Sequence, residues 1–117
     1  MNELEVIYAQ LSIEDYVSLY EFYAAIQTFS KLPNNKVIDL LNLKLDEIKS
    51  IIPIELYTSE EFLGEKMPVP WKKVQLSDVI LDNGEPAGVP FYFFSLKFGV
   101  SEMEAMKLLD SASKEHS

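Results

Sequence analysis

The sequence predicts a mainly α fold: a small single-domain helical bundle of about four to five helices over residues 1–117, with a loop-rich middle and at most one short β-hairpin. The 117 residues are about one domain long, and 48% hydrophobic with 25% charged residues is typical of a globular protein. Residues 12–52 carry apolar side chains at helical spacing in two stretches, which predicts a helical hairpin. Residues 53–90 are richer in Pro and Gly, and residues 91–112 again resemble two helices.

The first predicted helix covers residues 13–29. Residues 3–11 precede it as a short strand or an N-terminal arm, and Ser12 occupies the N-cap position, with Asp15 three residues later. Apolar side chains cover most of the circumference of this helix, whereas a surface helix of a small domain usually has a narrower apolar stripe. The helix is therefore expected either at the centre of the core or partly covered by another chain.

Three tyrosines follow one another along this helix at positions i, i+4 and i+7, namely Tyr16, Tyr20 and Tyr23. Two interpretations are open. They are core aromatics whose hydroxyl groups reach the rim of the protein, or they form an aromatic stripe that contacts a partner. We include all three among the candidate partner-binding residues.

The second predicted helix covers residues 36–52 and ends at Pro53, which cannot continue a helix. Residues 42–44 could divide it into two shorter helices. In either form it is expected to pack against the first helix and complete the hairpin of residues 12–52.

The middle of the chain has weaker signals. Residues 54–57 are expected to be extended, and Thr58 with Glu61 predicts the start of a short helix. Trp71, beside two prolines, either closes the edge of the core or contacts a partner. Residues 82–85 predict a turn that lacks the repeated acidic positions of a calcium loop.

The C-terminal part is predicted to be a helix over residues 91–98, a sharp turn at Gly99 and a second helix capped by Ser101. A strand over residues 91–96 is the alternative, because aromatic residues favour strands. The aromatic segment supplies two further candidate partner-binding residues, Phe91 and Phe94.

The charge and the residue counts exclude several classes of function. The chain has 19 acidic residues, ten lysines and no Arg, for a net charge of −9, which argues against direct binding of nucleic acid and favours a partner with basic patches. It has no Cys, and its only His is His116, close to the end of the sequence. We therefore expect no enzymatic activity, no cofactor and no metal site. No apolar run is long enough to span a membrane and no signal peptide is recognised, so a cytoplasmic location is expected.

The turn at residues 98–101 resembles that of a helix-turn-helix DNA reader, in which a Gly allows the turn and a Ser caps the recognition helix. The likeness covers residues 91–110, but the recognition helix would present Glu102 and Glu104 to a polyanion. The alternative function that it implies is a transcription-associated regulator. In that alternative the residues closest to DNA would be Ser101, Lys97 and Lys107.

A second resemblance covers residues 11–52. Residues 11–16 stand at the start of a helix, and a turn and then residues 37–41 and 43–48 follow. This order resembles that of small helical tail-assembly chaperones of tailed phages. This resemblance implies a non-catalytic protein that shields the apolar helices of a client, in the host cytoplasm if it is phage-encoded. Our first hypothesis is therefore a protein-interaction protein that docks a helix in an apolar groove, with its acidic residues steering a basic client; self-association is also open.

Overall fold

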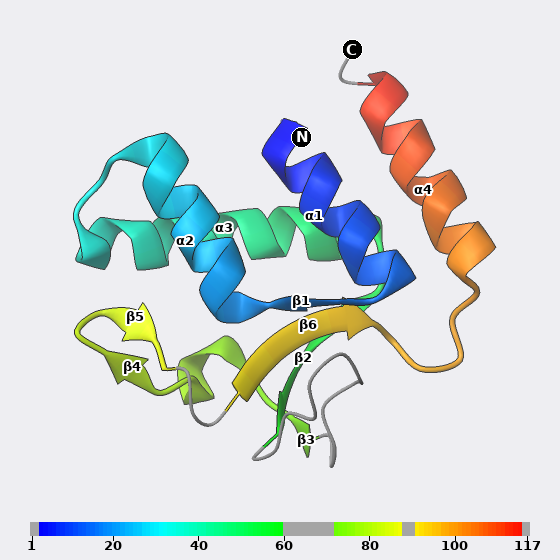
Figure 1. The fold of residues 1–117 in the computed structure, drawn as a ribbon. Helices are drawn as coiled ribbons and strands as arrows, with labels where there is room; N and C mark the ends of the chain where they lie inside the picture. The colour runs from blue at the N-terminus through cyan, green and yellow to red at the C-terminus, as the bar shows by residue number, and fades with distance from the viewer. Residues whose placement is uncertain (1–2, 60–71, 88–90, 116–117) are drawn as a thin grey trace.

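The computed structural model describes residues 3–59, 72–87 and 91–115 and shows a mixed α/β fold in place of the predicted mainly α bundle. Within these residues there are four α-helices, a four-stranded antiparallel sheet and a separate two-stranded hairpin. Helices α1, α2 and α3 lie on one side of the four-stranded sheet, and α4 lies beside α1 (Figure 1). One cluster of buried side chains joins the helices to the sheet.

The elements have the following bounds in chain order. The helices are α1 (Glu3–Glu14), α2 (Leu19–Ser30), α3 (Asn34–Ile51) and α4 (Glu102–Glu115), with a short 3-10 helix η1 (Leu76–Asp78). The strands are β1 (Tyr16–Ser18), β2 (Ile54–Ser59), β3 (Lys72–Lys73), β4 (Leu81–Asp82), β5 (Glu85–Pro86) and β6 (Phe91–Leu96).

The N-terminal segment forms helix α1, where a strand or an arm was expected. Its buried side chains are Glu5, Ala9, Ser12 and Ile13, which share one helical face. Two of these four are polar, so the inward face does not stand out in the hydrophobic pattern. Ser12 is not an N-cap: it lies inside α1, and its hydroxyl group donates a hydrogen bond to the carbonyl oxygen of Ala9 at 2.6 Å.

The predicted helix of residues 13–29 is divided by strand β1. The N-cap of α2 is Ser18, whose Oγ accepts a hydrogen bond from the backbone N–H of Glu21 at 3.4 Å. Helix α2 ends at Lys31, which has a left-handed backbone (φ 56°) and donates its N–H to the carbonyl oxygen of Gln27. The prediction of one helix over residues 13–29 is wrong because residues 16–18 are extended and Ser18 caps a new helix.

Helix α3 is one continuous helix close to the predicted range, without the possible break at residues 42–44. Its buried face consists of Val37, Leu41, Leu45 and Ile48, at helical spacing, and it packs against α2. The chain leaves α3 at Ile52 and enters β2 directly after Pro53.

The segment predicted as the first helix of the C-terminal pair is strand β6, the second strand in the sheet order β1-β6-β2-β3. Tyr92 and Phe94 point to the helices and join the main core, whereas the ring of Phe93 contacts those of Tyr16 and Tyr57. Because four consecutive residues of β6 are buried, the apolar run shows no alternation and can be mistaken for a helix. The predicted helix-turn-helix geometry is therefore wrong.

Strand β2 pairs with β6 in antiparallel register from Ile54 opposite Leu96 to Ser59 opposite Phe91. Thr58, predicted as the cap of a short helix, lies in this strand and donates its hydroxyl to the carbonyl oxygen of Phe91 at 3.0 Å; Glu61 lies outside the described residues.

The turn predicted at residues 82–85 connects β4 and β5. Asn83 and Gly84 both have positive φ, of 54° and 84°, as a two-residue hairpin turn requires. The side chain of Asn34 at the start of α3 donates to the carbonyl oxygen of Asn83 at 3.1 Å and so ties the hairpin to the helices.

Helix α4 begins where the sequence predicts. The backbone N–H of Glu104 donates to Ser101 Oγ at 3.4 Å, and Gly99 has the positive φ (83°) that the preceding turn needs. Ala105 and Leu109 are buried and anchor α4 in the main core.

Candidate functional site

The predicted partner-binding aromatics are spread over separate parts of the fold. Tyr23 and Phe94 are buried, with exposed fractions of 1% and 0%, and belong to the core. Tyr20 on α2 is 48% exposed. Trp71 lies outside the described residues. Tyr23 is therefore a core residue, whereas Tyr20 lies on the surface, where the partner-binding alternative stays open.

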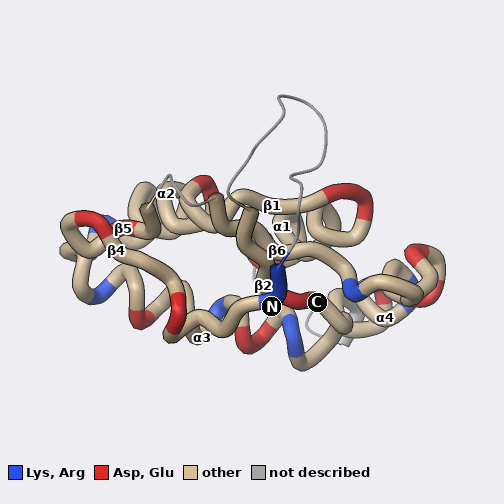
Figure 2. Tube along the Cα trace, turned by 90° about the horizontal axis from the view of Figure 1, so that it is seen from below, with Lys and Arg blue, Asp and Glu red and all other residues tan. Residues whose placement is uncertain are grey.

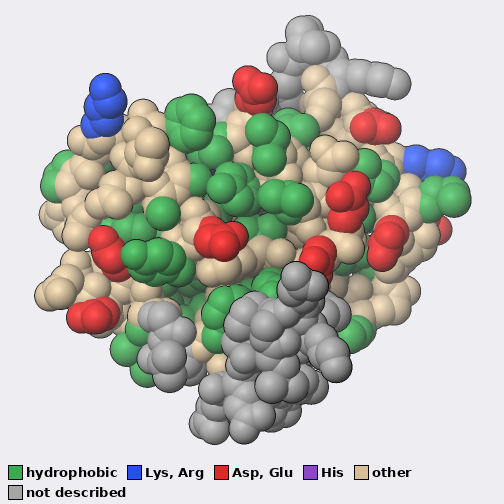
Figure 3. All heavy atoms as spheres, in the orientation of Figure 1, with side chains coloured by type: hydrophobic (Ala, Val, Ile, Leu, Met, Phe, Trp, Pro, Cys, Tyr) green, Lys and Arg blue, Asp and Glu red, His purple; other side chains and the backbone are tan. Residues whose placement is uncertain are grey.

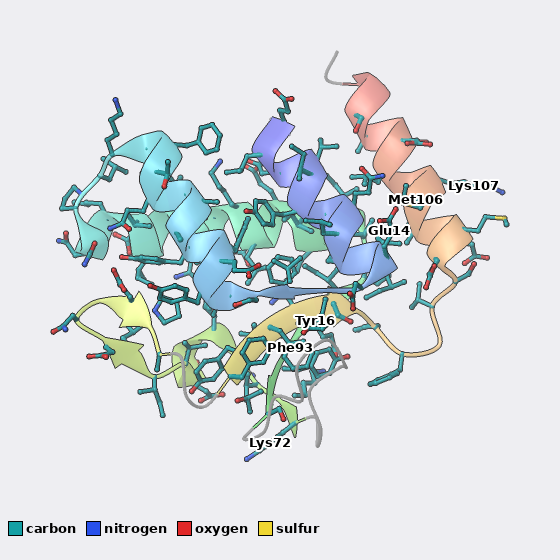
Figure 4. All side chains as sticks on the ribbon, in the orientation of Figure 1. Glu14, Tyr16, Lys72, Phe93, Met106 and Lys107 are labelled. Carbon is teal, nitrogen blue, oxygen red and sulfur yellow. The ribbon has the colours of Figure 1, made fainter. Side chains whose placement is uncertain are left out.

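Tyr16 and Phe91 are the two predicted residues that the structure brings together. They lie on the neighbouring strands β1 and β6, with ring centroids 6.0 Å apart in an edge-to-face arrangement. Both are half-buried. The ring of Tyr16 also packs on that of Phe93, with a centroid distance of 5.4 Å (Figure 4). This aromatic group packs on the sheet and contributes to its stability.

Tyr23 carries a buried hydroxyl group without a hydrogen-bond partner among the described residues. Burial, followed by the charge of Glu85, raises the pKa of Tyr23, so the group stays neutral. We expect Tyr23→Phe to leave the free energy of unfolding unchanged or to raise it by up to about 1 kcal/mol, because the change removes an unsatisfied polar group. Denaturant unfolding would measure this. A loss above about 1 kcal/mol would show that the hydroxyl group has a stabilising partner.

The candidate site is an apolar groove between α1, α2 and α3, with a volume of about 640 Å³. Phe29 is 75% exposed and Ile7 is 48% exposed, so large hydrophobic side chains face solvent here. Figure 3 shows hydrophobic side chains gathered over α1 and α2 on the face turned to the viewer. The groove is lined by Glu3, Leu4, Ile7, Tyr8, Ala25, Ile26, Phe29, Ser30, Leu40 and Lys44.

The groove exists because each of its three helices has apolar residues on more than one face. Helix α1 buries the face of Ala9 and Ile13 and leaves Leu4, Ile7 and Tyr8 for the groove. Reasoning from sequence missed the α1 wall because it treated residues 3–11 as a strand or an arm. The signal was present, since Leu4, Ile7 and Leu11 keep helical spacing.

An ion pair joins α1 to α3 at the edge of the groove. Lys44 Nζ lies 2.7 Å from Glu5 Oε1, and the two side chains are only 13% and 4% exposed. Burial alone would raise the pKa of Glu5, but the hydrogen bonds with Glu47 and with Lys44 outweigh it and lower that pKa. The hydrogen bond to Glu5, together with burial, raises the pKa of Glu47. Glu5 therefore stays ionised and holds α1 against α3.

The charges around the groove are mainly negative. Glu3 lines it and is exposed, and Glu21 is close enough to Tyr8 for its charge, after burial, to raise the pKa of that tyrosine. Lys44, the cation in the lining, is already paired with Glu5. Figure 3 shows acidic side chains around the hydrophobic area. Among the described residues, the rim of the groove is therefore acidic.

The residues of the DNA-binding alternative do not form a DNA-reading surface. Ser101 caps α4, which does not follow a helix but a strand. Lys97 Nζ lies 3.4 Å from Glu55 Oε1, and Lys107 points away from the body of the protein (Figure 4). The first turn of α4 carries Glu102 and Glu104, which would repel a phosphate backbone.

Two properties of the described residues bear on other classes of function. No group of three or more His, Cys, Asp and Glu side chains in that part of the chain is placed to hold a metal ion. Across the same residues, none of the helices combines the length and the apolar character needed to cross a membrane.

The groove combines an apolar floor with an acidic rim among the described residues. Comparisons of the chain with models of protein families, with curated protein sequences and with solved structures find no match.

Proposed function

We propose that this chain is a non-catalytic protein-binding module whose α1–α2–α3 groove takes an amphipathic helix of a partner protein. The observation that carries the proposal is the exposure of Phe29 and Ile7 at the two walls of an apolar groove. Two 12-residue helices form these walls, each about 18 Å long, which suits a partner helix of about three turns. Such a helix would place apolar residues at i, i+3 or i+4, and i+7 in the groove.

The charge of the chain supports a basic partner over a second copy of the same chain. A second copy would bring another nine negative charges to a rim that is already acidic, whereas Lys or Arg residues flanking an apolar stripe would be attracted to it. A chaperone that shields an apolar helix of its client is one form of this function. Sedimentation at two protein concentrations would test self-association, which this proposal does not require.

Two groove variants test the site. We expect Phe29→Gln and Ile7→Gln each to weaken binding of a basic amphipathic peptide about tenfold or more, because each removes a large apolar contact. The probe is a three-turn peptide with Leu at i, i+4 and i+7 and Lys elsewhere, followed by fluorescence anisotropy and by NMR shift mapping. Both positions are exposed and helical, so the variants should fold.

The matched control is Leu43→Gln on α3, which is 61% exposed but does not line the groove. It should leave the affinity within about twofold of the wild type. A peptide with the same leucines but with Glu in place of Lys should bind about tenfold more weakly. The proposal fails if the control weakens binding as much as the groove variants, or if the peptide shifts residues elsewhere.

A further inference from the structure

A second charged surface lies beside strand β2. Three lysines from separate elements line a shallow depression of about 710 Å³: Lys49 from the last turn of α3, Lys73 from β3 and Lys97 just after β6. Viewed from below, basic residues of several elements lie together near β2 (Figure 2). None of the residues that line this depression lines the apolar groove.

One carboxylate lies among these lysines. Glu55 Oε1 is 2.7 Å from Lys73 Nζ and 3.4 Å from Lys97 Nζ, and the Glu55 side chain is 16% exposed. The hydrogen bond with Lys73 lowers the pKa of Glu55, burial opposes this, and Lys97 lowers it further. Glu55 therefore carries its negative charge at neutral pH.

The charges of the depression do not balance. Among the described residues, three lysines and one glutamate line it, which gives three minus one, a local charge of +2, in a chain of net charge −9. Asp78 does not line the depression, and its carboxylate accepts the backbone N–H of Gln75 at 3.1 Å. An ion pair that only joined β2 to β3 would need Lys73 alone. Lys97 and Lys49 add charge that Glu55 does not neutralise.

The chemistry of the lining favours a phosphate group. Lysine ammonium groups bind phosphate as point charges, without the bidentate geometry that Arg would add and that this chain lacks. A phosphate monoester carries about −1.5 to −2 charges at pH 7, which matches the local excess. The side chains of Gln75 and Ser77, also in the lining, add hydrogen-bond donors for its oxygens.

We propose that the depression formed by Lys49, Lys73 and Lys97 beside Glu55 binds a phosphate group. The group can be inorganic phosphate or the phosphoryl group of a modified peptide, since both present the same oxygens to the lysines. This site is independent of the helix-binding groove, because the two share no lining residue.

NMR titration of the ¹⁵N-labelled protein tests the site, with ionic strength held constant by sodium chloride. We expect inorganic phosphate to shift the amides of the three lysines and of Gln75 and Ser77 along a saturating curve. A phosphoserine peptide, compared with its unphosphorylated form, is the second arm. Saturation at lower concentration by this peptide assigns the site to a modified protein, and equal or weaker saturation assigns it to the free anion.

Variants with opposite expected effects on phosphate affinity distinguish a binding site from a structural ion pair. Lys73→Gln combined with Lys97→Gln should weaken phosphate binding about tenfold or more, and Lys36→Gln combined with Lys107→Gln, two exposed helical lysines, should leave it within about twofold. Glu55→Gln removes the competing carboxylate and should tighten binding severalfold. Shifts that grow linearly without saturation, shifts spread over all ten lysines, or an unchanged affinity in the Lys73/Lys97 variant would overturn the proposal.

Discussion

Phe94→Ala is expected to lower the free energy of unfolding by about 3–5 kcal/mol, a large part of the roughly 5–15 kcal/mol that stabilises a domain of this kind. Phe94 is fully buried in strand β6, and its ring lies edge-to-face on that of Phe22 at a centroid distance of 5.2 Å. The substitution leaves a cavity between the sheet and α2, where the neighbouring backbone can collapse only in part. Denaturant unfolding followed by circular dichroism would measure the loss.

The same experiment decides whether Phe94 is a partner-binding residue, as the sequence suggested. Phe29→Ala is the control, because its ring is 75% exposed and its removal should change the stability by less than about 0.5 kcal/mol. A Phe94→Ala protein that keeps wild-type stability but loses binding of the basic peptide would place Phe94 at an interface. The burial of its ring predicts the opposite.

Lys44→Met is expected to cost about 3 kcal/mol of stability at pH 7, because it leaves the Glu5 carboxylate buried without its counter-ion. Methionine keeps most of the volume of the lysine stem, so lost packing contributes little. The effect should be local to the wall of the groove, and hydrogen exchange of the α1 amides should speed up. Lys73→Met is the control: its carboxylate partner Glu55 keeps Lys97 nearby and reaches water, so the loss should stay below about 1 kcal/mol.

The cost of Lys44→Met should depend on pH with a definite sign. In the wild type the pKa of Glu5 lies below its ordinary value of 4.5, so its stabilising contribution is present at neutral pH and is lost as the pH falls through the folded-state pKa. Glu47 acts in the other direction, because its pKa is raised and its contribution is lost as the pH rises.

Without Lys44 the buried Glu5 carboxyl has a higher pKa and is neutral in acid. The difference in stability between the wild type and Lys44→Met should therefore be greatest near pH 7 and shrink towards about pH 3. Unfolding curves of both proteins at several pH values would show this. A difference that stays constant over this range would mean that the loss of stability does not come from the ionised carboxylate of Glu5.

The parts of the fold that follow from local chemistry could be predicted from the sequence. The continuous α3, the cap of α4 at Ser101 and the turn at Asn83 and Gly84 each depend on residues within a few positions of one another. Such local signals predict the same structure in most folds: periodic apolar spacing predicts a helix, a serine at an N-cap its start, and an Asn-Gly pair a hairpin turn.

The parts that depend on distant residues could not be predicted in the same way. Strand β6 is apolar on both faces because helices cover one face and the rings of Tyr16 and Tyr57 pack on the other, which no local pattern reveals. The burial of Glu5 in α1 also depends on a distant residue, because its counter-ion Lys44 lies 39 positions away. The helical spacing of Leu4, Ile7 and Leu11, by contrast, was a local signal for the α1 wall. The sequence therefore predicted an apolar helical surface in residues 13–29, but not the residues that line the groove.

The pairing of β6 between β1 and β2 also has a consequence for the order of events during synthesis. Its partners Tyr16–Ser18 and Ile54–Ser59 leave the ribosome long before Phe91–Leu96, so neither early strand can pair with β6 until that later segment has been translated. Until β6 is present, the apolar faces of α2 and α3 that pack on the sheet remain exposed to solvent. We therefore expect a nascent chain that lacks β6 to expose apolar surface that molecular chaperones recognise.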